Sequence, residues 1–71
     1  MEDKVKKILE EMLKMNIDDN FSKYSTDKWD SFFHLDLVVK LENEFGISFT
    51  PDEIGGMESL KNIVDIINGK I

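Results

Sequence analysis

The sequence predicts an all-α fold, a small bundle of three main helices plus one short helix, with a long loop between the first and second helices. Apolar residues recur at helical spacing in three segments, and capping residues precede two of them. The only alternating stretch, residues 47–49, is too short to form a stable sheet alone. The 71 residues fit a single domain spanning residues 1–71, and the absence of cysteine excludes a disulfide framework.

The first predicted helix covers residues 3–15. Its apolar residues form one stripe, and lysines and glutamates occupy the other face. The stripe consists of Val5, Ile8, Leu9, Met12 and Leu13.

Residues 16–30 predict a long loop, because they are rich in asparagine, aspartate, serine and threonine, which favour turns and caps. Four large apolar side chains are interspersed among them: Ile17, Phe21, Tyr24 and Trp29. We therefore expect the loop to fold over the core, with these four side chains as its anchors.

The second predicted helix covers residues 31–45. Asp30 is a good N-cap, which makes Ser31 the first helical residue, and Gly46 is a natural stop. The apolar side of the helix contains Leu37, Val38, Leu41 and Phe45, with Leu35 beside them.

Three apolar residues of this helix fall outside its tightest apolar arc: Phe32, Phe33 and Val39. Exposed apolar groups often mark a contact surface, so these residues are candidates for partner binding. The alternative is that Phe32 and Phe33 pack beneath the long loop.

Residues 46–71 predict two short helices. Thr50, Pro51 and Glu53 have capping-box spacing, and Gly55-Gly56 should end that helix almost at once. Ser59 can cap the last helix, and Gly69 lies past its end. The apolar residues of the last helix are Leu60, Ile63, Val64 and Ile67.

The net charge is −6, from 15 acidic residues against 9 lysines. This balance argues against binding to nucleic acid or to an anionic membrane surface, and it favours basic protein partners. No apolar run approaches the length of a bilayer span or resembles a secretory signal, so we expect a cytoplasmic protein without membrane insertion. A binding or carrier module suits so short a chain better than an enzyme does.

Metal and catalytic sites find little support. Asp18-Asp19-Asn20 begins like a calcium loop, but the required glycine and the final glutamate are missing. His34 is the only histidine, which excludes a multi-histidine zinc site. Ser31 lacks the base and orienting group that a catalytic serine needs, so we expect no catalytic and no metal-ligating residues.

The stretch that begins Asp30-Ser31-Phe32 and continues through Leu41-Glu42-Asn43-Glu44-Phe45-Gly46-Ile47 resembles the acyl carrier protein family. That family has Asp-Ser-Leu at the start of its second helix, after a long loop, and a Leu-Glu-x-x-Phe pattern later in the same helix. Thr50 to Ile54 is similar to the family's short third helix, and Leu60 to Ile67 to its last helix. The similarity in helix order and loop placement covers essentially the whole chain.

The resemblance implies that Ser31 carries a 4′-phosphopantetheine arm, beside the cap residue Asp30. A phosphopantetheinyl transferase of the holo-ACP synthase type would attach the arm, using coenzyme A. The thiol of the arm would hold an acyl or aminoacyl group as a thioester. The protein would not be an enzyme; it would present this group, as a monomer, to enzymes of fatty acid, polyketide or related biosynthesis.

The resemblance also implies a contact face, in which Asp36 and the apolar Phe32, Phe33 and Val39 meet basic docking surfaces of partner enzymes. It further implies that aliphatic and aromatic residues between the helices line a space where a longer acyl chain can hide. These residues include Leu41, Phe45, Ile54, Met57 and Ile63.

Several residues depart from the family pattern. Phe32 replaces the leucine after the serine, Phe33 stands where fatty-acid carriers often have an acid, and Lys40 interrupts the acidic face. These differences point towards a specialised stand-alone carrier, without choosing its pathway. The alternative function is a non-carrier acidic helical module that binds a partner protein, in which Ser31 is only a helix start.

Overall fold

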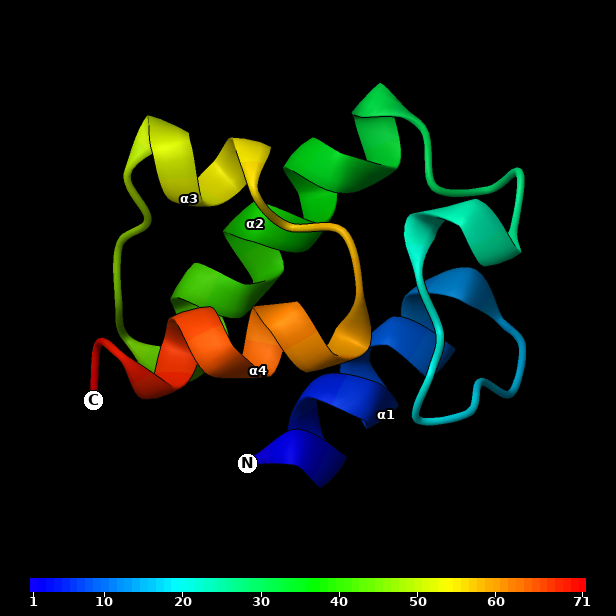
Figure 1. Cartoon of the computed structure of the whole chain (residues 1–71), viewed down its shortest axis with the longest axis horizontal. Coiled ribbons are helices and arrows are strands. Elements are labelled where there is room, and N and C mark those ends of the chain that lie inside the picture. The colour runs from blue at the N-terminus through cyan, green and yellow to red at the C-terminus, as the bar shows by residue number, and fades with distance from the viewer.

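The computed structural model describes all residues from 1 to 71 and confirms the predicted small helical bundle (Figure 1). Four α-helices and one 3-10 turn follow in the order α1 (Glu2–Leu13), η1 (Lys23–Ser25), α2 (Ser31–Phe45), α3 (Pro51–Gly55) and α4 (Leu60–Asn68). None of the four helices combines the length and the apolar character needed to cross a bilayer.

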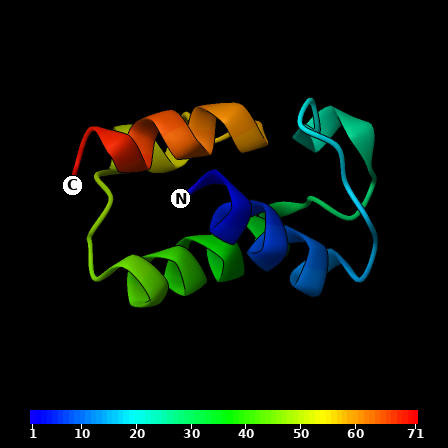
Figure 2. The ribbon, with the colours of Figure 1, turned by 90° about the horizontal axis from the view of Figure 1, so that it is seen from below.

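Helix α1 lies at the centre of the bundle, between α4 on one side and α2 on the other (Figure 2). All sixteen buried residues are hydrophobic, and they form one continuous core. Helix α1 contributes four of the five residues of its predicted stripe, and α4 contributes all four of its predicted residues. The fully inaccessible members include Leu9, Leu37, Leu41, Leu60, Ile63 and Ile67.

Both long helices end in a left-handed residue. Helix α1 ends at Leu13, two residues earlier than predicted, because Lys14 adopts φ 56° and its N–H bonds to the carbonyl of Glu10. Gly46 ends α2 as predicted, with φ 64° and an N–H bond to the carbonyl of Glu42. Glycine adopts this conformation without steric cost, whereas Lys14 adopts it with a side chain in place.

The long loop covers one end of the bundle, as expected, and three of its four predicted anchors are buried: Ile17, Phe21 and Trp29. The prediction was wrong for Tyr24, whose side chain is 79% exposed. Tyr24 lies in the short turn η1, which is fixed by reciprocal hydrogen bonds between Ser22 and Ser25 and directs the phenol into solvent.

A short backbone pairing holds the loop against the connection between α3 and α4. The N–H of Lys23 donates to the carbonyl of Glu58 at 2.8 Å, and the N–H of Leu60 donates to the carbonyl of Phe21 at 3.0 Å. Ser22 and Ser59 thereby form an isolated antiparallel bridge. This pairing places the loop beside the start of α4.

Leu35 corrects the prediction for the apolar side of α2. It was expected beside the core arc, but its side chain is 60% exposed. Leu35 lies about 60° around the helix from Val38, since three residues advance an α-helix by about 300°. The rest of the protein buries Leu37, Val38 and Leu41 but does not cover the side of α2 on which Leu35 lies.

Candidate functional site

Ser31 is the first residue of α2 and is exposed to solvent. Asp30 precedes it in an extended conformation and acts as the N-cap, as predicted. The Asp30 carboxylate accepts a hydrogen bond from the N–H of Phe33 at 2.9 Å. Asp30 therefore caps the start of the helix, and the hydroxyl of the neighbouring serine is not needed for this role.

The hydroxyl group of Ser31 makes no hydrogen bond within the protein. The chain has five serines, and three of them, Ser22, Ser25 and Ser59, bond to backbone N–H groups at turns or caps. Ser48 is also free, but it lies in the connection between α2 and α3 rather than at a helix start. Ser31 is thus the one serine that combines an unengaged, accessible hydroxyl with the positive end of a long helix.

A surface pocket of about 470 Å³ opens beside Ser31. Three parts of the chain form it: the long loop, the first turns of α2, and the end of α3 with the residues just after it. The lining residues are Lys23, Trp29, Asp30, Ser31, His34, Leu35, Gly55 and Met57.

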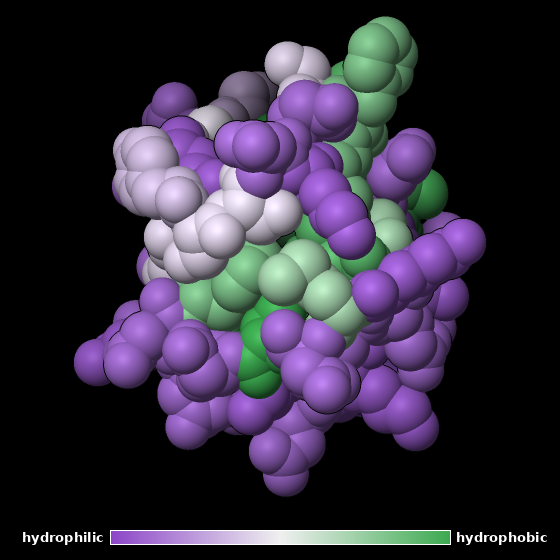
Figure 3. Space-filling model, turned by 90° about the vertical axis from the view of Figure 1, so that its right-hand side faces the viewer, coloured by the Kyte–Doolittle hydropathy of each residue, from purple (hydrophilic) through white to green (hydrophobic).

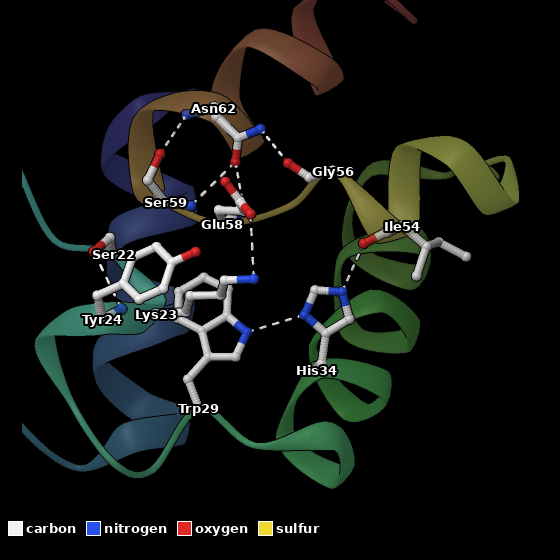
Figure 4. A network of polar contacts seen from close by, with 10 residues as sticks. All are labelled: Ser22, Lys23, Tyr24, Trp29, His34, Ile54, Gly56, Glu58, Ser59 and Asn62. Carbon is white, nitrogen blue, oxygen red and sulfur yellow. Dashed lines mark hydrogen bonds and ion pairs between the residues drawn. The ribbon is translucent and has the colours of Figure 1, made fainter.

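The ring of His34, one of the lining residues, makes two hydrogen bonds within the protein (Figure 4). The indole N–H of Trp29 donates to Nδ1 of His34 at 2.9 Å, and Nε2 of His34 lies 2.7 Å from the carbonyl oxygen of Ile54. Both contacts are satisfied by the neutral imidazole with its proton on Nε2, which then donates to the carbonyl. His34 therefore joins the loop, α2 and α3.

The pocket is also lined by Lys23, which forms an ion pair with Glu58. Nζ of Lys23 lies 3.2 Å from the carboxylate of Glu58, as the dashed line in Figure 4 shows. The hydrogen bond to Glu58, followed by the charge of this carboxylate, raises the pKa of Lys23 above its usual value. Lys23 is thus a cation near Ser31 whose charge is already balanced.

The exposed surface of α2 contains four residues that share one side of the helix, here named the α2 face: Phe32, Leu35, Asp36 and Val39. Their spacing of three, four and seven residues places them in adjacent turns. The Phe32 side chain is 82% exposed and that of Val39 is 56% exposed. Figure 3 views the loop end of the molecule, where apolar groups emerge among mostly hydrophilic surface.

Phe33 is separated from this face. Its ring is half-buried and meets the ring of Trp29 edge-on, with 5.7 Å between centroids. Of the two phenylalanines, Phe33 therefore packs against the loop, whereas Phe32 projects into solvent. Leu35, rather than the predicted contact residue Phe33, therefore belongs to the α2 face.

The charge of Lys40 is directed away from Asp36 along the helix. Nζ of Lys40 lies 3.3 Å from the carboxylate of Glu44, one turn further on. The two charges compensate each other, so Asp36 remains as an exposed negative charge among the apolar residues of the α2 face.

No cluster of three histidine, aspartate or glutamate side chains lies close enough together to hold a metal ion. No protein-family model matches the sequence, and no curated protein is significantly similar to it.

Proposed function

We propose that the protein is an acyl carrier protein whose Ser31 carries a 4′-phosphopantetheine arm. The observation that carries the proposal is the free hydroxyl of Ser31 at the first position of α2, beside the cap formed by Asp30. The resemblance of the surrounding sequence to acyl carrier proteins supports the same assignment, as does the order of the helices.

Attachment of the arm would be a phosphoryl-group transfer catalysed by a separate transferase. Oγ of Ser31 forms a bond to the phosphorus atom that bears pantetheine in coenzyme A. The bond from that phosphorus to the bridging oxygen of the diphosphate breaks, adenosine 3′,5′-bisphosphate leaves, and the hydroxyl proton passes to a base of the transferase. The residues around Ser31 suit this step, because no intramolecular hydrogen bond has to be broken.

The surroundings of Ser31 also suit the attached group. The phosphodiester would lie at the N-terminus of a 15-residue helix, where unpaired N–H groups and the helix dipole favour negative charge. The chain contains no cysteine, so the arm would supply its only thiol. That thiol, when loaded, holds the acyl group as a thioester.

The α2 face supports a role in presenting that group to other proteins. Phe32, Leu35 and Val39 expose apolar surface next to the charge of Asp36, close to the attachment residue. A partner with a basic rim and an apolar centre would complement this face, and the net charge of −6 would speed its approach. We infer that the protein serves several such enzymes as a monomer in the cytoplasm.

The test is to incubate the protein with coenzyme A and a broad-specificity phosphopantetheinyl transferase and to measure its intact mass. The expected result is a gain of one phosphopantetheine unit by the wild type and by Ser48→Ala, and no gain by Ser31→Ala. Ser48→Ala is the matched control, because Ser48 is the other serine with a free hydroxyl.

If none of the three proteins gains mass while a known carrier in the same tube does, the proposal fails. The exposed α2 face would then favour the alternative function, a non-carrier module that binds a partner protein.

A further inference from the structure

The seam between α2 and α3, next to the pocket beside Ser31, is closed by a histidine. His34 bonds through one ring nitrogen to Trp29 of the loop and through the other to the carbonyl of Ile54 in α3. Figure 4 shows the imidazole lying between the indole and the end of α3. A group that passed from Ser31 into the bundle between these elements would have to displace it.

The core behind this seam is already filled. Leu41 and Ile63 are completely inaccessible to solvent, and Met57, which lines the pocket, is 1% exposed. A chain inserted here would have to push apart side chains packed at the density of a protein interior. It would also leave the indole N–H and the Ile54 carbonyl without their partner, which is costly for groups that are partly buried.

The pocket outside the seam has a different character. Its lining includes the charged side chains of Lys23 and Asp30 and the imidazole of His34, with apolar contributions from Trp29, Leu35 and Met57. A short acyl group could lie at this open surface of mixed polar and apolar character, whereas a long alkyl chain lying there would stay partly in contact with water.

We propose that His34 determines cargo specificity: by bridging Trp29 and Ile54 it keeps the thioester cargo out of the helical core and restricts it to short acyl or aminoacyl groups. This inference rests on the proposed function, since it concerns what the arm on Ser31 carries. It differs from the sequence-based expectation that a long acyl chain hides between the helices.

The experiment uses Ser31→Cys, whose new thiol is the only one in the chain and can be alkylated without any transferase. The thiol is coupled to a spacer of pantetheine length that ends in either an acetyl or an octanoyl group. Methyl NMR then compares the two adducts at Leu41 and Ile63, which are buried and do not line the pocket.

With His34 present, the acetyl and octanoyl adducts should give the same Leu41 and Ile63 methyl shifts and the same melting temperature. In the His34→Ala background the octanoyl adduct alone should shift these methyl signals and melt at a higher temperature. Leu35→Ala is the matched control, because Leu35 lines the same pocket without bridging to α3, and it should behave like the parent.

Octanoyl-specific shifts at Leu41 and Ile63 in the presence of His34 would overturn the inference. If His34→Ala does not fold, Trp29→Phe removes one of the two hydrogen bonds while keeping an aromatic ring, and it should give smaller shifts of the same kind. Because alkylation needs no enzyme, this result is independent of whether Ser31 is a transferase substrate.

Discussion

The carboxylate of Asp30 accepts a hydrogen bond from the N–H of Phe33 at 2.9 Å, and the hydroxyl between them in the sequence, that of Ser31, is left without a partner. In the other caps with a hydroxyl residue, at Ser22, Thr50 and Ser59, that hydroxyl itself accepts the backbone N–H. Because Asp30 supplies the cap, the hydroxyl group of Ser31 remains free to be modified.

Replacing Asp30 tests its role as the N-cap of α2. Asp30→Ala removes the cap and should lower the free energy of unfolding by about 1 kcal/mol. Asp30→Ser restores a side-chain acceptor and should recover most of the loss. Urea denaturation at pH 7 measures both, and equal stabilities for the alanine and serine variants would contradict the assigned role of the cap.

Phe32 and Phe33 are neighbours in the sequence with opposite expected effects. Phe33→Ala removes a ring packed on Trp29 and should cost about 2 kcal/mol of stability, less than a fully buried phenylalanine. Phe32→Ala should stay within about 0.5 kcal/mol of the wild type, because its side chain is largely in solvent. Thermal and urea unfolding of the two variants provide the comparison; a larger loss for Phe32→Ala would show that the α2 face is misassigned.

Asp36 offers an electrostatic test of partner docking. Asp36→Lys reverses an exposed charge on the α2 face, and we expect kcat/KM for modification by the transferase to fall about tenfold at low salt. The difference from the wild type should shrink as salt is added, since screening weakens surface electrostatics.

The matched control for this charge reversal is Asp65→Lys, on the exposed side of α4. It makes the same change in net charge at a distance from Ser31 in the sequence and on another helix. If Asp65→Lys slows modification as much as Asp36→Lys does, net charge rather than the α2 face governs the encounter.

Glu53 is expected to make the stability of the folded protein depend on pH in the acidic range. Its carboxylate accepts hydrogen bonds from Lys70, at 2.7 Å, and from the N–H of Thr50, at 2.8 Å. The hydrogen bond from Lys70, followed by the one from Thr50, lowers the pKa of Glu53 below its ordinary value of 4.5. The folded state therefore binds the proton less readily than the unfolded state does.

It follows that the stability supplied by Glu53 is present above about pH 4.5 and is lost as the pH falls through the lower, folded-state pKa. Urea midpoints measured from pH 7 to pH 3 should fall less steeply for Glu53→Gln than for the wild type. Glu11→Gln, at an exposed position without an ion pair, should retain the wild-type slope. Parallel slopes for all three proteins would refute the prediction.

The features that the sequence predicted well are those fixed by local chemistry. Asp30 and Gly46 mark the ends of α2 because capping and left-handed conformations depend on one or two residues. Thr50 and Ser59 begin α3 and α4 for the same reason. The position of Ser31 at a helix start was predictable because it depends only on these local signals.

The features that escaped prediction depend on contacts between distant segments. Tyr24 and Leu35 are large side chains like their buried neighbours, and the path of the loop and the limited cover of α2 leave them exposed. The bridge from Trp29 through His34 to Ile54 needs α3 to end beside the first turns of α2, which no periodicity encodes. The closeness of Trp29 and His34 in the sequence was the one available signal.

The most direct test of the central claim is to locate the modification by fragment mass spectrometry. After incubation with coenzyme A and the transferase, cleavage after lysine releases residues 29–40, in which Ser31 is the only serine and no threonine occurs. The carrier assignment predicts that phosphopantetheine is found on this peptide and is absent from residues 41–61, which contain Ser48, Thr50 and Ser59. Modification on the second peptide, or none on either while a known carrier in the same tube is modified, would contradict it.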